Sequence, residues 1–187
     1  MLPSRIIFAA LFSSLLVPAL ARAQSDVFWE AEDAATTTMT TEGSYRPLTP
    51  EESAVVSNGA WLNGNVGDDE LSADYEIAVP AAGKFNFYVR KYWQHGAFRW
   101  SVDGGAWNEV RKTDLIDAAV LREYVPLCWV ALGDLELTKG SHKLRLEVVN
   151  DPNYEFSKSF GFDCFLLTQG EIHEYLETHR EIAGEPK

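Results

Sequence analysis

The stretch of residues 84–107 constrains the fold of this chain more than any other part of it. It begins with Phe85, Phe87 and Val89 in alternation with more polar residues, the period-two pattern of a strand with one buried face. The alternation breaks and resumes over residues 98–102, after which an Asp-Gly pair marks a hairpin turn. The pattern predicts two strands joined by a short loop that carries Trp93, Gln94 and His95.

This loop combines aromatic rings with an amide and an imidazole. Such rings stack on sugars, and the polar groups hydrogen-bond to sugar hydroxyls. Loops often carry binding residues, but aromatic side chains of a loop can also simply pack on the edge of a sandwich. Packing of Trp93 on the rim is therefore the alternative to sugar binding.

Many short strands separated by turn signals predict an all-β fold, an antiparallel β-sandwich. After residue 168 the pattern changes, and Ile172, Tyr175 and Leu176 at helical spacing predict a short amphipathic C-terminal helix. Residues 114–122 are expected to form an irregular insertion or one helical turn. Further strands are expected at residues 27–30, 55–61, 74–79, 107–110, 144–148 and 160–167, and a pair of strands with a kink at Gly133 is expected at 129–137.

The length of 187 residues suggests one domain, and 46% hydrophobic residues are ample for a core. The formal net charge is −12, from 28 acidic and 16 basic residues. This charge argues against nucleic acid or an anionic membrane as a main partner. It suits an exported protein or one that holds cations.

Residues 1–23 are interpreted as a secretory signal peptide. Arg5 precedes the apolar run 6–20, and Ala21-Arg22-Ala23 has the small-residue pattern of a cleavage site. The alternative is an N-terminal membrane anchor, for which the interrupted run is short. We therefore expect a secreted, periplasmic or cell-surface protein without membrane insertion after cleavage, with a domain at 24–168 and a helix and tail at 169–187.

The chain has two cysteines, Cys128 and Cys164. An oxidising compartment permits a disulfide between them. Both lie in apolar, strand-like runs, where cysteine often packs as a small buried hydrophobe. The sequence leaves both states open.

Glu30, Glu32 and Asp163 are candidate metal ligands. In a strand Glu30 and Glu32 point to the same side, where two carboxylates repel unless they are exposed, protonated or bridged by a cation. Ca²⁺ accepts several carboxylate and carbonyl oxygens with little geometric strictness. Asp163 completes the set if the first and last strands are neighbours. The alternative is a pair of solvated surface carboxylates.

The chain from Phe28 to Thr168 resembles the carbohydrate-binding modules of families 6 and 35. The motifs that carry this resemblance are, in order, EAE at 30–32, ADYEI at 73–77, VPAAGKF at 79–85, YVR at 88–90, SVDGG at 101–105, LTKGSHKLRL at 137–146 and FDCFLLT at 162–168. The resemblance implies a jelly-roll sandwich with a structural calcium near the first and last strands. It assigns Glu30, Glu32 and Asp163 as the ligands.

The same resemblance implies a sugar site at the loop rim. Trp61 matches the aromatic residue of the first loop, and Asn150 matches the asparagine before the last strand. The tryptophan-rich segment of these families is matched only loosely, by the stretch from Tyr124 to Trp129, and the loop at 90–96 departs from their pattern. Core packing and a turn asparagine are the alternatives for Trp61 and Asn150.

The best interpretation is an exported, non-catalytic module that binds a polysaccharide or glycan and acts alone or beside a partner protein or enzyme. The first alternative is a structural or adhesive cell-envelope domain that binds protein. The second is a glycan-active hydrolase or lyase, the lyase with His95, Tyr92 and Arg90 as base, acid and charge neutraliser. No G-x-S-x-G motif, phosphate loop or dinucleotide fingerprint occurs in the sequence.

Overall fold

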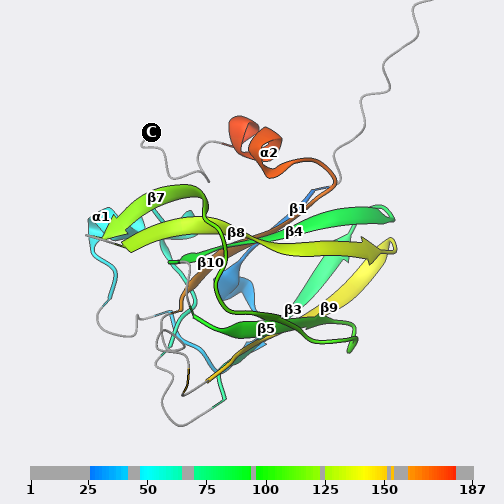
Figure 1. Cartoon of the computed structure of the whole chain (residues 1–187), viewed down its shortest axis with the longest axis horizontal. Helices are drawn as coiled ribbons and strands as arrows, with labels where there is room; N and C mark the ends of the chain where they lie inside the picture. The colour runs from blue at the N-terminus through cyan, green and yellow to red at the C-terminus, as the bar shows by residue number, and fades with distance from the viewer. Residues whose placement is uncertain are drawn as a thin grey trace, which may run out of the picture.

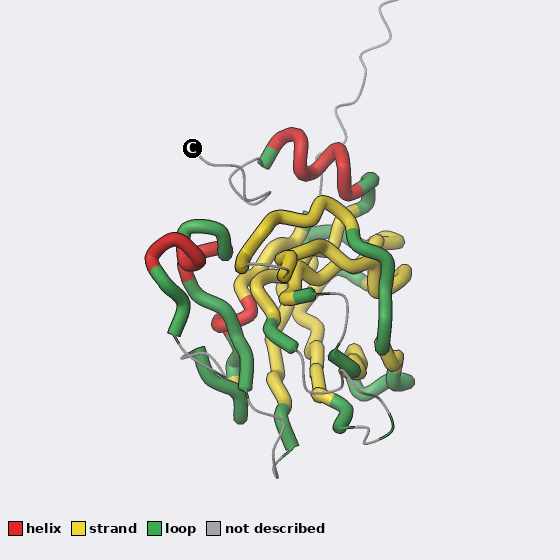
Figure 2. Tube along the Cα trace, turned by 60° about the vertical axis from the view of Figure 1, so that its left-hand side comes forward, coloured by secondary structure: helices red, strands yellow, loops and turns green. Residues whose placement is uncertain are grey.

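Strands β4 (Gly83–Tyr92) and β5 (Phe98–Val102) are the two strands predicted from the central stretch. In the computed structural model they lie in different sheets. The chain therefore passes from one layer of the sandwich to the other between them (Figure 1). The structure describes residues 26–41, 47–64, 70–93, 96–122, 125–150, 153 and 160–179. Strands make up most of this part, and the helical segments are short (Figure 2).

Two five-stranded antiparallel sheets form the sandwich among the described residues, which confirms the predicted fold class. The first sheet has the order β1 (Val27–Glu30), β10 (Phe162–Thr168), β4, β8 (Val125–Leu137) and β7 (Ile116–Arg122). The second has the order β2 (Thr36–Thr37), β3 (Ser72–Val79), β9 (Gly140–Val148), β5 and β6 (Asn108–Val110). The first and last strands are neighbours, with Glu30 opposite Cys164.

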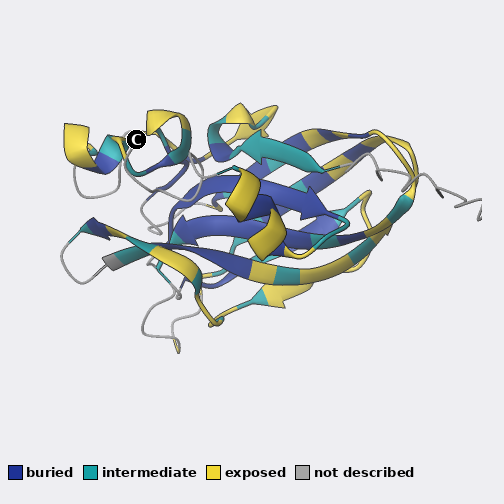
Figure 3. Ribbon diagram, turned by 90° about the horizontal axis from the view of Figure 1, so that it is seen from above, coloured by how far each residue is buried: buried dark blue, intermediate teal, exposed yellow. Residues whose placement is uncertain are grey.

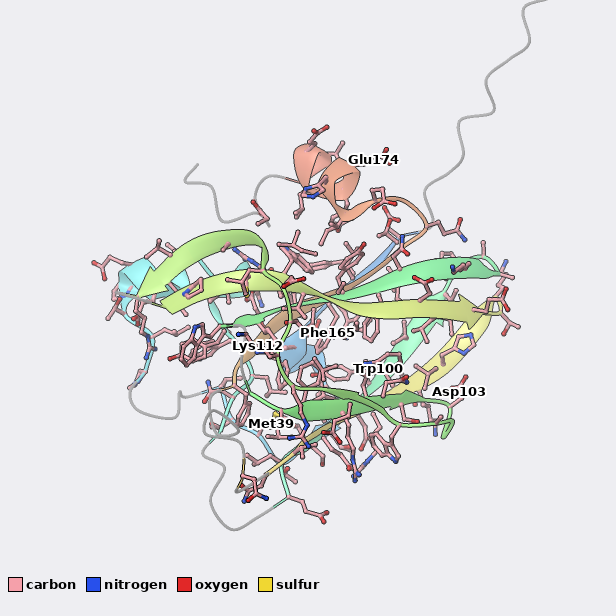
Figure 4. All side chains as sticks on the ribbon, in the orientation of Figure 1. Met39, Trp100, Asp103, Lys112, Phe165 and Glu174 are labelled. Carbon is pink, nitrogen blue, oxygen red and sulfur yellow. The ribbon has the colours of Figure 1, made fainter. Side chains whose placement is uncertain are left out.

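The main core fills the space between the sheets and is rich in aromatic rings. Phe87 meets Trp100 edge to face at 5.1 Å between ring centroids, and Trp29 stacks on Phe165 at 5.2 Å. Trp100 and Phe165 are seen between the two layers in Figure 4. Alternation along β4 places Phe85, Phe87 and Val89 in this core, as the sequence predicts.

Helix α2 (Ile172–Thr178) lies across the outer face of the first sheet (Figures 1 and 3). Its residues Ile172, Tyr175 and Leu176 are buried against a cluster that includes Tyr88 and Trp129. The predicted C-terminal helix is thus confirmed. Because the helix covers this face, the central strands β4 and β10 are buried on both sides.

Residues 55–61 do not form the expected strand. The chain instead makes a helical turn α1 (Pro50–Ser53) and a 3₁₀ turn η2 (Ser57–Gly59). Thr49 caps α1, since its side chain accepts a hydrogen bond from the N–H of Glu52 and its own N–H donates to the Glu52 carboxylate. The apolar residues of this stretch do not join a sheet but pack against side chains from strands β7 and β8.

Residues 114–122 do not form an insertion or helical turn but contain the edge strand β7. Its register against β8 shifts at two places, and Asp117 has a φ of +47°. Bulges of this kind break the period-two pattern on which strand prediction depends. The expected pair of strands at 129–137 is instead part of the single strand β8, whose register against β4 shifts near Gly133.

The predicted signal peptide and the residues Gln94, His95 and Tyr124 lie outside the described part of the chain. Export and the roles of these three side chains therefore remain predictions. Of the helices in the described ranges, none has the length and apolar character needed to span a bilayer.

Candidate functional site

The loops that carry Trp61, Trp93 and Asn150 meet at one end of the sandwich. Trp93 follows the end of β4, and its N–H donates to the carbonyl of Pro126 at 2.8 Å. Asn150 follows the end of β9, where the N–H of Val149 donates to the carbonyl of Ala97 at 2.8 Å. The residue after Trp61 pairs with the start of β10. The described residues that anchor these three loops therefore lie at the same end of the sandwich.

The side chain of Trp61 is not exposed at this end of the sandwich. The prediction that it stacks on a sugar is therefore wrong. Its side chain is only 3% exposed and packs in a small cluster with Val56, Leu121 and Leu127. Tyr92 meets the indole edge to face at 5.5 Å, and the guanidinium of Arg122 lies 5.7 Å from the ring centroid. Residues from several loops and strands thus enclose the ring.

Gly161 leaves the space that the Trp61 indole occupies. A Cβ at this glycine would lie 2.9 Å from two ring carbons, closer than real Cβ contacts. The glycine thus lets the ring approach the backbone before β10 closely. A side chain here would push the indole out of its cluster.

Trp93 is half-buried at the same end and has a left-handed backbone with a φ of +57°. Its carbonyl accepts a hydrogen bond of 2.9 Å from the ammonium of Lys91, which is 1% exposed. Asn150 is exposed. Of the predicted sugar-binding residues within the described ranges, Trp93 and Asn150 thus have side chains that solvent reaches.

Sequence reasoning missed Lys91 and Arg122 as parts of this end. Arg122 forms an ion pair of 2.9 Å with Glu52, which holds the α1 loop against β7. The signal for Lys91 was present in the Arg90-Lys91 pair within an apolar strand. Successive residues of a strand point to opposite faces, so two adjacent cations in a central strand cannot both reach solvent on one open face.

Arg90 and Asp163 form a buried ion pair beside this end. The guanidinium Nη1 lies 3.0 Å from Asp163 Oδ2, and both residues are 0% exposed. The same Nη1 donates to the carbonyl of Val55 at 3.2 Å, and the N–H of Ser57 donates to Asp163 Oδ1 at 2.8 Å. A glycan cannot reach this guanidinium, so Arg90 does not fit the role of charge neutraliser in a lyase.

Glu30 and Glu32 both accept hydrogen bonds from residues of the η2 turn. Glu30 Oε1 accepts a hydrogen bond of 2.7 Å from the Ser57 hydroxyl, and Glu32 Oε1 accepts one of 3.1 Å from the Asn58 amide. Strand β1 ends at Glu30, and Glu32 belongs to the 3₁₀ turn η1 (Ala31–Asp33). The expectation that both glutamates lie in one strand is therefore wrong.

Burial raises the pKa values of two of these carboxyl groups. The pKa of Asp163 rises to about 7, although the charge of Arg90 and the N–H of Ser57 favour its ionised form. The pKa of Glu30 is also raised, first by burial and then by the negative charges of Glu32 and Asp33. The cluster therefore disfavours further negative charge unless a cation enters.

The predicted set of three calcium ligands is not assembled within the described residues, where no group of three or more acidic, His or Cys side chains is arranged to hold a metal. Both oxygens of Asp163 are already bonded, to Arg90 and to Ser57. Glu30 Oε2 and Glu32 Oε2, in contrast, are buried and have no hydrogen-bond partner. Buried carboxylate oxygens without a partner are the kind of donor that a cation prefers, whereas both oxygens of Asp163 already accept hydrogen bonds.

A polar hollow of about 510 Å³ lies at the opposite end of the sandwich. Its lining is Ala82, Gly83, Lys84, Asn86 and Gln169. This lining holds amides and an ammonium but no aromatic ring. It lacks the apolar surface on which a sugar ring stacks.

No family model matches the chain, and no curated protein matches it in sequence. The solved structures similar to it include a GH26-CBM35 β-(1,4)-mannanase from Podospora anserina, with a TM-score of 0.53 and 17% identity over 79% of this chain and 28% of that one. The insecticidal crystal protein Cry2Aa has a TM-score of 0.52 and 10% identity over 76% of this chain and 21% of that one. The C-terminal CBM6 of the laminarinase LamC from Zobellia galactanivorans has a TM-score of 0.48 and 12% identity over 77% and 99%.

These likenesses concern the fold, because all three identities are below 25%. The two likenesses with TM-scores above 0.5 support the predicted sandwich at the level of the fold alone. The chain spans only 28% of the length of the mannanase and 21% of that of the crystal protein. Since proteins with such different descriptions share the fold, function has to be argued from the site.

Proposed function

We propose that this chain is a non-catalytic carbohydrate-binding module that recognises a polysaccharide or glycan at the end of the sandwich where Trp93 and Asn150 lie. The observation that carries the proposal is the half-buried Trp93, whose backbone is held at this end by two hydrogen bonds. Its N–H donates to the carbonyl of Pro126, and its carbonyl accepts from the ammonium of Lys91. A fixed aromatic ring offers an apolar face at little cost in conformational entropy.

The polar part of the proposed site is Asn150, whose amide is exposed and able to donate to and accept from sugar hydroxyls. Gln94, His95 and Tyr124 remain proposed contributors from segments outside the described residues. Trp61 supports the site from beneath through its contact with Tyr92. A sugar ring would lose water from its C–H face on the indole of Trp93 while its hydroxyls meet the amides.

A structural calcium is part of this proposal. The buried, unpartnered oxygens of Glu30 and Glu32 support it, as oxygens are the ligands that Ca²⁺ takes. Here the ion would neutralise the two neighbouring carboxylates beside the η2 turn and stabilise the fold without chemistry. We further propose export by the N-terminal segment to a secreted, periplasmic or cell-surface location.

A protein partner is the second candidate, and one observation favours it. Val120 on the edge strand β7 is 77% exposed, and an exposed apolar edge can pair with a strand of another chain. An adhesive domain would use this edge, whereas a sugar-binding module would use the loop end around Trp93. The two places are neighbours, since Pro126 pairs with Val120 and its carbonyl accepts from the N–H of Trp93. A glycan-active enzyme has less support, because Arg90 is sealed in the core.

A glycan microarray tests the proposal, run with the mature protein in calcium and again with a chelator. We expect binding to a defined set of glycans, weaker in the chelator if the ion stabilises the fold. A Trp107→Ala variant is the matched control, because Trp107 is 42% exposed and lies towards the far end of the second sheet. A flat array would contradict the proposal, and so would equal binding by the wild type and Trp93→Ala.

A further inference from the structure

The backbone of Trp93 is unusual for its residue type. Four non-glycine residues in the described ranges have a positive φ, and the other three are Asn58, Asp103 and Asp117. Asn and Asp tolerate the left-handed region, because their short polar side chains bond locally. For a bulky residue the same conformation brings Cβ too close to the following carbonyl oxygen, so it persists only where the surroundings impose it.

The surroundings that impose it include a buried cation. Lys91 is 1% exposed, and its Nζ donates to the carbonyls of Tyr92 at 3.2 Å and Trp93 at 2.9 Å. On the other side, the N–H of Trp93 donates to Pro126 at 2.8 Å. The peptide units around Trp93 are thus held from both strands, β4 and β8.

The buried ammonium and the strained tryptophan depend on each other. A buried charge is tolerated only when hydrogen bonds replace its lost water, and the two carbonyls at the end of β4 supply acceptors. These carbonyls turn towards Lys91 as the chain leaves the extended conformation at Trp93. An ordinary strand end would carry neither a sealed lysine nor a left-handed tryptophan.

Strained residues of this kind cluster at ligand-binding sites, where the strain orients a group for binding. We propose that Lys91 is a positioning residue that holds Trp93 in its left-handed conformation. Lys91 thereby sets the direction in which the indole of Trp93 meets the glycan, a role that rests on the function proposed above. Lys91 itself does not touch the ligand, because it is sealed beneath the loop.

The chemistry of the lysine pocket agrees with this role. Burial lowers the pKa of Lys91 to about 8, and the titratable group facing it from β8 is the thiol of Cys128, which lies 3.6 Å from the Lys91 carbonyl. At neutral pH the amine is therefore still charged and carries three donors for the loop carbonyls.

The first experiment compares Trp93→Gly with Trp93→Ala. Both variants lose the indole, so they differ chiefly in their tolerance of a positive φ. We expect the glycine variant to melt at a higher temperature than the alanine variant, the reverse of the usual order within a strand. A lower melting temperature for the glycine variant would overturn the claim that the conformation is strained.

The second experiment measures the coupling between the two positions. Lys91→Met should lower the melting temperature and change the near-ultraviolet circular dichroism contributed by Trp93, assigned by subtraction of the Trp93→Gly spectrum. The loss should be smaller when Lys91→Met is made in the Trp93→Gly background. Equal losses in both backgrounds would mean that Lys91 does not act on Trp93. Lys84→Met, on the same strand but 65% exposed, is the control.

The third experiment relates this coupling to binding. Lys91→Met should weaken glycan binding by at least tenfold, while Lys84→Met leaves it unchanged. Coupling without any loss of affinity would overturn the positioning role. If wild-type protein binds no glycan, the proposed function fails, yet the melting and dichroism data still decide whether Lys91 holds Trp93. If Lys91→Met does not fold, Lys91→Gln, which keeps one amide donor group, replaces it in each comparison.

Discussion

Arg90 and Asp163 face each other across the neighbouring strands β4 and β10, with Nη1 3.0 Å from Oδ2 and with neither residue exposed to solvent. The pair also holds the η2 turn, since Arg90 donates to Val55 and Asp163 accepts from Ser57. Through this turn the pair links the sheet to the glutamates at the end of β1. It is therefore the polar centre around which the loop end is organised.

Arg90→Met should destabilise the fold strongly. It leaves the Asp163 carboxylate buried without its cation, which typically costs about 3–5 kcal/mol while the group is ionised. Because burial already raises the pKa of Asp163 to about 7, uptake of a proton reduces this loss at lower pH. Urea unfolding measures the loss. Lys84→Met removes the ion pair with Asp134, whose partners are 65% and 52% exposed, and should have little effect. Similar unfolding midpoints for the two variants would show that the buried pair does not stabilise the fold.

His142 should titrate above its usual range. Its Nδ1 lies 2.7 Å from Asp103 Oδ2 and its Nε2 lies 2.9 Å from the Thr138 carbonyl, so only the imidazolium donates to both acceptors. The Asp103 hydrogen bond, the Thr138 carbonyl and the Asp103 charge raise the pKa of His142. The resulting stability is fully present below the unfolded pKa of about 6.5 and is lost as pH rises through the folded value.

The same pair predicts a loss of stability in acid. The Lys143 N–H and His142 lower the pKa of Asp103, so its stabilisation is present above its unfolded pKa and lost as pH falls through the folded value. NMR titration of the imidazole measures the shift, and Asp103→Asn should bring the His142 pKa down. An unchanged titration in Asp103→Asn would refute the role of this carboxylate.

Calcium should raise the melting temperature if Glu30 and Glu32 hold the ion. An ion that binds only the native state adds about 2.7 kcal/mol at a hundredfold excess over Kd. Glu30→Gln combined with Glu32→Gln should remove the response to calcium, whereas Glu76→Gln on β3 should keep it. A melting temperature that changes with neither calcium nor chelator would exclude the ion.

Both cysteines should be free thiols. Cys128 lies in the core between the sheets, whereas Cys164 lies in the cluster beneath α2 on the other face of the same sheet. The sheet therefore separates the two sulfurs. Burial also raises the thiol pKa values, to about 11 for Cys128. Thiol titration should find almost no reaction in the native protein and two thiols after denaturation without reductant; a bridge would leave none.

Trp93→Ala should abolish measurable glycan binding while the fold survives. Asn150→Ala should only weaken binding, because a neutral hydrogen bond contributes about 0.5–1.5 kcal/mol. Trp61→Ala should act differently, through the loss of about 3–5 kcal/mol of stability expected for a buried tryptophan. Calorimetry on an array-selected glycan, with melting curves for each variant, separates these effects. Unimpaired binding by Trp93→Ala would remove the indole from the site.

The sequence alone determined the elements whose signal is local. Alternation along β4, β5 and β9 predicts the strands, because side chains of a strand point to opposite faces in turn. The spacing of Ile172, Tyr175 and Leu176 likewise predicts α2 and its buried face. The order of the short motifs predicts the type of sandwich.

Only the tertiary structure decided which polar and aromatic side chains are sealed. Trp61 is buried by residues of distant segments, and Asp163 meets Arg90 rather than the two glutamates, because β10 pairs with β4 as well as with β1. No local pattern contains these neighbours. The edge strand β7 escaped prediction for the same reason, since its bulges depend on its pairing with β8. Burial, pairing and charge at a site are properties of contacts between segments far apart in sequence, and only folding brings those segments together.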